Sequence, residues 1–167
     1  MRIIILLLII IVFINGSARA GELLKNTDFK QGTREWSVSG SMTGIQHDSD
    51  GNRFFCFDSR KEKLIRVFQK ISLKPGKYVW RVELKTDKPG RVTGYIWGRN
   101  KDAGKAEKVV GSASRKSPGN KWISLSSNFT VDSQFDARIF DIICDKKYDG
   151  KFFIRRPSLQ KYSPKVK

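Results

Sequence analysis

The fold is decided by Tyr78-Val79-Trp80-Arg81-Val82-Glu83-Leu84 and by the segment after the next turn, Arg91-Val92-Thr93-Gly94-Tyr95-Ile96-Trp97. Successive side chains of a β-strand point to opposite faces of its sheet. In the first segment four large apolar residues share one face: Tyr78, Trp80, Val82 and Leu84. Arg81 and Glu83 occupy the other face. The alternation therefore predicts a strand with one side buried in a core.

The second segment alternates in the same way, but its outer face is aromatic. If Val92 and Ile96 point to the core, Tyr95 and Trp97 stand together on the opposite side. The connection Asp87-Lys88-Pro89-Gly90 has the residues of a tight turn, and we interpret the two segments as a hairpin. This interpretation places Arg81 and Glu83 beside Tyr95 and Trp97, so that all four side chains converge on one groove.

The same short β-rich runs, separated by Pro-Gly and Asp-Gly turns, continue along the chain. The expected strands are Leu23–Phe29, Trp36–Ser39, Arg53–Asp58, Leu64–Leu73, Tyr78–Thr86, Arg91–Trp97, Lys108–Ser112, Trp122–Phe129, Ala137–Cys144 and Lys151–Leu159. No segment after residue 20 has helical periodicity. The pattern predicts an all-β protein, a two-sheet antiparallel β-sandwich with less than about 10% helix.

Residues 1–20 have the features of a secretory signal peptide. Arg2 precedes an unbroken apolar run, and Ala18-Arg19-Ala20 has the small-x-small pattern of a cleavage site. The apolar run is shorter than the about 20 residues that span a bilayer, although a retained N-terminal anchor is the alternative. We expect a secreted or periplasmic protein with no membrane span in its mature part. We expect residues 21–160 to form one domain and residues 161–167 to form a basic flexible tail.

The chain is strongly basic, with 33 Lys and Arg against 16 Asp and Glu and a net charge of +17. This charge favours association with polyanions such as acidic polysaccharides, although a generally solvated basic surface is the alternative. The cations are dispersed along the chain, and no base-reading motif accompanies them. Specific nucleic acid binding is therefore not expected. Nothing in the pattern indicates an oligomeric state.

Four blocks in order resemble the carbohydrate-binding modules found beside xylanases, of the family 4/9 type. They are the opening Leu23–Gly40, the block Gln69–Tyr78 with Leu73-Lys74-Pro75-Gly76, the segment from Trp122 to Thr130, and the closing Phe152–Leu159. The resemblance implies a galactose-binding-domain-like jelly roll that binds sugar chains without cleaving them.

The chain departs from this family where acidic residues help to hold a structural Ca²⁺. Thr27 and Lys30 replace a usual Gly and Glu, and Arg155-Arg156-Pro157 replaces a frequent Asp-Asp-Val. Because cations stand in place of ligands, we expect neither this calcium site nor any other cofactor. The loop Asp48–Asn52 has alternate carboxylates but lacks the closing Glu of an EF-hand, so we interpret it as an Asp-Gly turn.

The sequence predicts no enzyme. His47 is the single histidine, and no nucleophile motif accompanies it. A glycosidase needs only two carboxylates, and Asp58, Glu83 and Asp141 are candidates for one sheet face. Neighbouring cations such as Arg81 make ion pairs or sugar hydrogen bonds the better interpretation of these carboxylates.

Cys56 and Cys144 are the two cysteines, and we expect both on core-facing positions of their strands. Because the protein is expected to be exported, they are candidates for a disulfide. Two buried thiols in apolar strands are the alternative.

The pattern as a whole predicts a binding module for polysaccharide, with an acidic chain favoured by the positive charge. Aromatic rings stack on sugar C–H surfaces while polar side chains bond the hydroxyls. The expected ligand-binding residues are Tyr95, Trp97, Arg81, Glu83 and Asp141. The alternative is an envelope structural or protein-interaction β-sandwich in which both rings fill a hydrophobic layer.

Overall fold

The computed structural model describes residues 21–61, 65–100, 107–144 and 147–162, and the expected signal peptide and most of the expected tail lie outside this part. All regular structure in it is β, which confirms the predicted fold class. The ten strands are β1 (Ser37–Ser39), β2 (Met42–His47), β3 (Arg53–Asp58), β4 (Arg66–Leu73), β5 (Gly76–Thr86), β6 (Gly90–Asn100), β7 (Glu107–Ser117), β8 (Ile123–Val131), β9 (Phe135–Cys144) and β10 (Lys151–Lys161).

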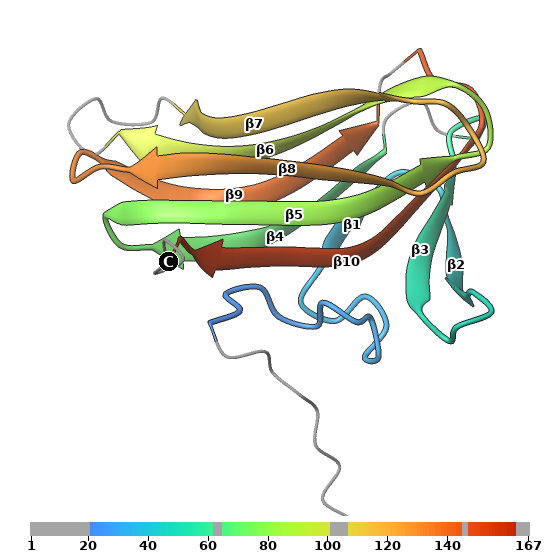
Figure 1. The fold of residues 1–167 in the computed structure, drawn as a ribbon, viewed down its shortest axis with the longest axis horizontal. Helices are drawn as coiled ribbons and strands as arrows, with labels where there is room; N and C mark the ends of the chain where they lie inside the picture. The colour runs from blue at the N-terminus through green and yellow to red at the C-terminus, as the bar shows by residue number, and fades with distance from the viewer. Residues whose placement is uncertain (1–20, 62–64, 101–106, 145–146, 163–167) are drawn as a thin grey trace, which may run out of the picture.

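The strands form two antiparallel five-stranded sheets that pack face to face as two layers (Figure 1). We call the sheet with strand order β1-β4-β9-β6-β7 the first sheet, and the sheet with order β2-β3-β10-β5-β8 the second sheet. The last strand in the chain, β10, lies at the centre of the second sheet, where it pairs with both β3 and β5. No helix in the described part of the chain is long and apolar enough to cross a membrane.

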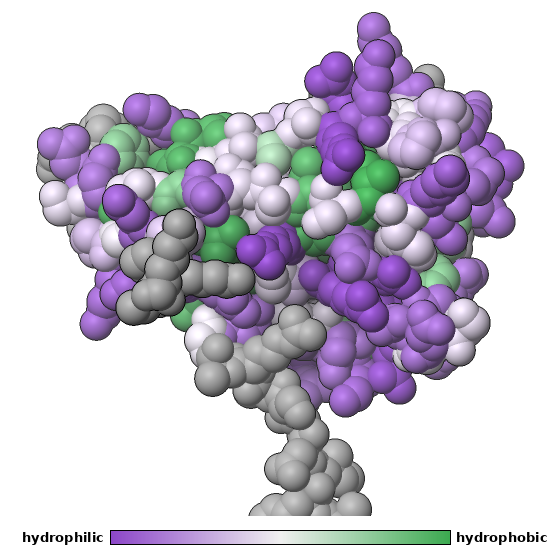
Figure 2. All heavy atoms as spheres, viewed as in Figure 1, coloured by the Kyte–Doolittle hydropathy of each residue, from purple (hydrophilic) through white to green (hydrophobic). Residues whose placement is uncertain are grey.

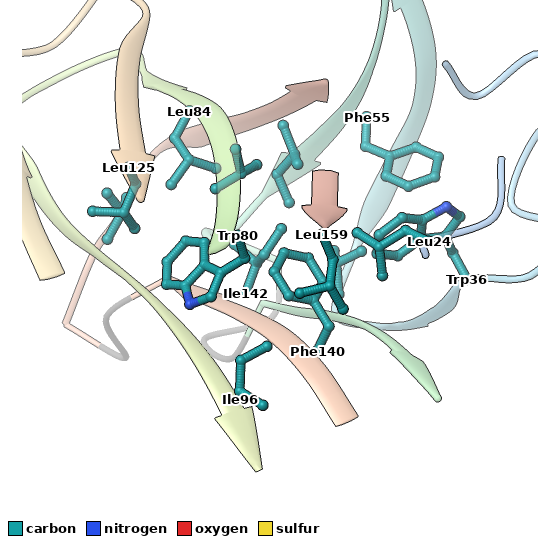
Figure 3. Close-up of a cluster of buried hydrophobic side chains, with 14 of the residues drawn as sticks. Leu24, Trp36, Phe55, Trp80, Leu84, Ile96, Leu125, Phe140, Ile142 and Leu159 are labelled. Atoms are coloured by element: carbon teal, nitrogen blue, oxygen red, sulfur yellow. The ribbon is translucent and has the colours of Figure 1, made fainter. Parts of the chain in front are cut away.

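The core lies between the two sheets and follows the predicted alternation. Trp80 of β5 is fully buried, with its ring edge against Phe140 of β9 at a centroid distance of 5.8 Å. Figure 3 shows Trp80, Phe140, Ile142 and Ile96 grouped between the layers. The predicted inward positions on β5 and β6 are confirmed as buried. The face of the molecule seen in Figure 2 carries hydrophilic side chains over much of its area, with several separate hydrophobic areas between them.

Glycine at position 94 allows the two sheets to approach each other closely at Trp80. A Cβ atom placed on Gly94 of β6 would lie 2.5 Å from an indole carbon of Trp80. Carbon atoms in good contact are about 3.5–4.0 Å apart. Strand β6, which carries Tyr95 and Trp97, therefore packs directly against the Trp80 ring.

The predicted strand Leu23–Phe29 is wrong, because this segment forms turns. Asn26 and Phe29 have positive φ angles of 48° and 54°, which a strand does not allow. Asn26 organises the turns: its side-chain amide donates to the backbone carbonyl of Gly32 at 2.9 Å, and its side-chain oxygen accepts from the Gln31 N–H at 3.1 Å. The side chain of Asn26 thus replaces the hydrogen bonds that a strand would supply.

The two cysteines are buried but are not bonded to each other. Cys144 points into the core from β9 of the first sheet, as predicted. Cys56 belongs to β3 of the second sheet, where Phe55 and Phe57 are the core residues, so the predicted inward position of Cys56 is wrong. The prediction failed because the run Phe54-Phe55-Cys56-Phe57 is apolar on both faces, so no alternation of apolar and polar residues shows which face is buried.

Candidate functional site

The outer side of the first sheet carries an aromatic and apolar surface, which we call the aromatic face. Tyr95 of β6 pairs across the sheet with Asp141 of β9, and Asp141 pairs with Phe68 of β4. In the next row Trp97 of β6 lies opposite Ile139 of β9. The two rings therefore stand on an inner strand of the sheet, where β9 and β7 support them on both sides.

Tyr95 and Trp97 form a ring pair on this face. Their centroids are 5.4 Å apart and their planes are tilted by 36°. Both side chains are half-buried, whereas the alternating Val92 and Ile96 are fully buried in the core. The predicted common face of the two aromatic residues is thus confirmed. Two tilted, partly accessible rings can offer their faces to successive apolar surfaces of a bent ligand.

Asp141 lies under this surface and is fully buried. Its Oδ2 accepts hydrogen bonds from Arg66 Nε at 2.8 Å and from Trp97 Nε1 at 3.0 Å. Its Oδ1 is buried without a hydrogen-bond partner among the described residues. Burial raises the pKa of the Asp141 carboxyl, although Arg66 and Trp97 oppose that shift. The carboxylate therefore holds the Trp97 ring and the Arg66 guanidinium in fixed positions.

The surroundings of the ring pair combine apolar and cationic side chains. Arg66 lies over the ring of Phe68 at 4.8 Å, which joins the ion pair to the aromatic surface. Half-buried aliphatic residues flank the rings: Val109, Ile139 and Ile143. Exposed cations stand around them on outward positions of β4, β6 and β7: Lys70, Arg91 and Lys116. The face can thus hold apolar ligand surface at its centre and negative charge at its edge.

The structure brings together three of the predicted site residues and separates the other two. Tyr95, Trp97 and Asp141 share the aromatic face, whereas Arg81 and Glu83 lie on the outer side of the second sheet. The predicted convergence of Tyr95, Trp97, Arg81 and Glu83 on one groove is therefore wrong. The turn Asp87–Gly90 does not close a hairpin, because it leads from the second sheet into the first.

Sequence reasoning missed Arg66 and Phe68, which complete the aromatic face. The available signal was the alternation in Arg66-Val67-Phe68, in which Val67 is fully buried and its neighbours point outward. The pairing of β4 with β9, which brings Arg66 to Asp141, joins residues that are 75 positions apart in the chain. No local pattern reports such a pairing.

Glu83 takes part in a separate ion-pair network on the second sheet. Arg155 bonds both Glu83, from its Nε at 2.6 Å, and Asp48, and its guanidinium lies 4.1 Å from the centre of the Trp122 ring. Asp48 Oδ1 also accepts from the backbone N–H of Asn52 at 2.8 Å. This confirms the Asp-Gly turn at residues 48–52. The part of the chain that the structure describes contains no cluster of potential metal ligands.

Comparison with known proteins finds similarity in structure alone. No protein-family model and no curated protein sequence matches the chain. A solved structure described as a family 16 carbohydrate-binding module has a TM-score of 0.65 and 21% identity, over 83% of this chain and 99% of that chain. The CBM22-2 xylan-binding domain of Xyn10C from Paenibacillus barcinonensis has a TM-score of 0.63 and 13% identity, over 81% and 98%. The chain thus shares the jelly-roll fold of these carbohydrate-binding modules.

A third similar structure is that of TmCBM61 in complex with β-1,4-galactotriose. It has a TM-score of 0.58 and 18% identity, over 84% of this chain and 99% of that chain. The resemblance to carbohydrate-binding modules seen in the sequence is thus confirmed at the level of the jelly-roll fold. At such identities the fold is shared, and the ligand must be argued from this chain's own residues.

Proposed function

We propose that the protein is an exported, non-catalytic binding module whose aromatic face takes a polysaccharide chain. The observation that carries the proposal is the Tyr95–Trp97 pair, with Trp97 tied to the buried Asp141. A fixed ring loses little conformational freedom when a sugar stacks on it, so more of the stacking energy appears as affinity. Support for export comes from the sequence of residues 1–20, with Gly21 as the expected first residue of the mature chain.

The cations around the face favour an acidic polysaccharide. Arg66 is already neutralised by Asp141, but Lys70, Arg91 and Lys116 stand exposed at the edge of the face. No ion pair joins these three cations to a carboxylate within the described ranges of the chain. Uronate or sulfate groups on a bound chain would meet these charges, and such contacts weaken as salt rises.

The placement of the carboxylates supports binding without cleavage. A glycosidase holds two carboxyl groups about 5–9.5 Å apart on either side of one bond. The three carboxylates expected on one face are divided by the structure. Asp58 and Glu83 belong to the second sheet and Asp141 to the first. Asp141 is moreover buried against Arg66 and Trp97, where it cannot flank a bound chain.

Replacement of the two rings tests the saccharide site. Tyr95→Ala and Trp97→Ala should each weaken binding of short oligosaccharides at least about tenfold, or about 1.4 kcal/mol, in isothermal titration calorimetry. Tyr95→Ala should leave the melting temperature nearly unchanged. Trp97→Ala should lower the melting temperature more than Tyr95→Ala does, because the buried Asp141 carboxyl then loses the hydrogen bond from Trp97 Nε1. Leu23→Ala is the control, since Leu23 is an exposed apolar residue whose backbone N–H bonds Leu159 of the second sheet, away from the aromatic face of the first sheet.

One observation favours a second function, that of a protein-interaction domain. Phe68, Ile139 and Ile143 add aliphatic and aromatic surface that a sugar does not require, and contiguous apolar patches often mark protein partners. A glycan array on which the mature chain binds no saccharide would contradict the first proposal and support this one.

A further inference from the structure

The outer side of the second sheet carries a regular row of positive charges, which we call the basic face. On β5, Lys77, Arg81 and Lys85 all point outward, because Tyr78, Trp80, Val82 and Leu84 fill the core. They recur at every fourth residue, so their Cα atoms are about 13 Å apart along the strand. The face thus presents cations at even intervals along the strand between β10 and β8.

A row of short polar side chains runs beside these cations on β8. Thr130 pairs with Lys77, Ser126 pairs with Arg81, and Ser124 pairs with Glu83. All three β8 residues are exposed, as is Asn128 between them. Hydroxyl and amide groups can both donate and accept hydrogen bonds. Since these side chains are small, an extended chain can approach the sheet and reach the cations.

The charges of the basic face are not cancelled by neighbouring acids. Glu83, the acidic residue within the row, is bonded by Arg155 at 2.6 Å and by Arg156 at 3.4 Å. Among the residues that the structure places, no ion pair involves Lys77, Arg81 or Lys85. Their charges are therefore available to a ligand.

Lys85 is held by aromatic rings at the end of the row. Its Nζ lies 4.6 Å from the centre of the Phe153 ring, 5.2 Å from Trp122 and 5.8 Å from Phe54. Rings attract an ammonium group but accept its N–H bonds only weakly. The rings thus fix the position of the ammonium and leave its donors for an anionic group.

We propose that the basic face binds an anionic polysaccharide independently of the aromatic face, so that the module has two binding surfaces on opposite sheets. Carboxylate or sulfate groups spaced along the chain pair with the row on β5, and the sugar hydroxyls bond the polar row on β8. The floor of the face along β8 is polar, and aromatic rings surround Lys85 at one end of the row, so the face suits a hydrated polymer. Arg81, expected from the sequence to bind an acidic glycan, then does so on this sheet and without Tyr95 or Trp97.

The test uses polygalacturonate as the probe and the Trp97→Ala protein as the background, so that failure of the aromatic face is kept apart from failure of the basic face. On this background, Lys77→Gln/Arg81→Gln/Lys85→Gln should weaken binding at least about tenfold. The slope of log affinity against log salt concentration should become shallower by the amount that about two to three lost ionic contacts would give. The matched control is Arg34→Gln/Lys61→Gln/Lys74→Gln, which removes the same charge from exposed loop positions and should change affinity less than about threefold.

The double variant Lys77→Gln/Arg81→Gln leaves the packed Lys85 in place and keeps the test valid if the triple variant is unstable. Equal losses in the face and control variants would overturn the proposal, because net charge alone would then explain the binding. Loss of all polygalacturonate binding in Trp97→Ala alone would also overturn it, since one face would suffice. Tighter binding of single-stranded DNA of equal charge, with the same dependence on Lys77 and Arg81, would assign the face to nucleic acid instead.

Discussion

Replacement of Gly94 by alanine should destabilise the sandwich through a single contact. The new Cβ would lie 2.5, 2.9 and 3.1 Å from three carbons of the Trp80 ring. The ring would have to move by about 1 Å to restore a normal separation. Trp80 is fully buried and rests against Phe140, so it has no free space to move into.

The cost of Gly94→Ala follows from two opposing effects. Overpacking of a core costs about 1–3 kcal/mol, and the tightness of this contact favours the upper half of that range. Alanine in a strand recovers about 0.5–1 kcal/mol relative to glycine. The net loss of unfolding free energy should be about 2 kcal/mol, or a fall in melting temperature of roughly 6–8 °C for a domain of this size. Chemical denaturation and calorimetry measure both quantities.

A double-mutant cycle separates the clash from other effects. Trp80→Phe removes the indole carbons that Gly94→Ala would meet, so the combined variant should lose less stability than the sum of the single changes, by about 1–2 kcal/mol. Gly98→Ala is the control on the same strand and should cost less, because its new Cβ would lie 3.0 Å from a methyl group of Val110 and 3.3 Å from the Asp136 carbonyl, which are looser contacts than those at Gly94. A Gly94→Ala protein within about 0.5 kcal/mol of the wild type would refute the packing of β6 against Trp80.

Three further predictions concern the charged groups and metal binding. Because burial raises the pKa of Asp141, the folded chain binds its proton more tightly than the unfolded chain, so Asp141 contributes most stability below pH 3.8 and less as the pH rises toward its folded pKa. The melting temperature of the wild type relative to Asp141→Asn should therefore fall between pH 3 and that raised value, and a constant difference would contradict this. Arg155→Gln should cost about 2–3 kcal/mol, since it leaves Asp48 and Glu83 without their shared cation, whereas the more exposed Arg156→Gln should cost less than about 1 kcal/mol. A chelator should leave the melting temperature of the wild type unchanged, because Arg155 and Arg156 stand where related modules have acidic calcium ligands. A large drop in melting temperature with chelator would show that a metal ion stabilises the fold.

The sequence predicted those features of the fold that depend on neighbouring residues. Alternation identified β5 and β6 and the common face of Tyr95 and Trp97, because one side of each strand is apolar and buried. The strand β2 was missed, since Gly44 interrupts its pattern with a φ of 136° at the edge of the sheet. The inward position of Cys56 was wrong because the residues around it are apolar on both faces.

The candidate site was predicted only in part, because its assembly depends on distant pairing. A short turn after β5 suggested a hairpin, yet Thr86 and Gly90 lie in different sheets. Turn residues determine how the backbone bends and do not determine which sheet the next strand joins. Arg66 reaches Asp141 only through the β4–β9 pairing, which no spacing in the sequence reports.

The central place of β10 sets a condition on when the protein can fold. Until Lys151–Lys161 is available, β3 and β5 have no strand between them, and the second sheet can exist only as the two separate pairs β2–β3 and β5–β8. Leu159 also receives the N-terminal segment, since its carbonyl accepts from the Leu23 N–H at 2.8 Å. Such pairing of the first and last segments is slow, because a long loop must close before any contact is gained. A chain synthesised from its N-terminus should thus keep its second sheet incomplete until β10 is free, and an incompletely folded chain of this kind is compatible with the export proposed above.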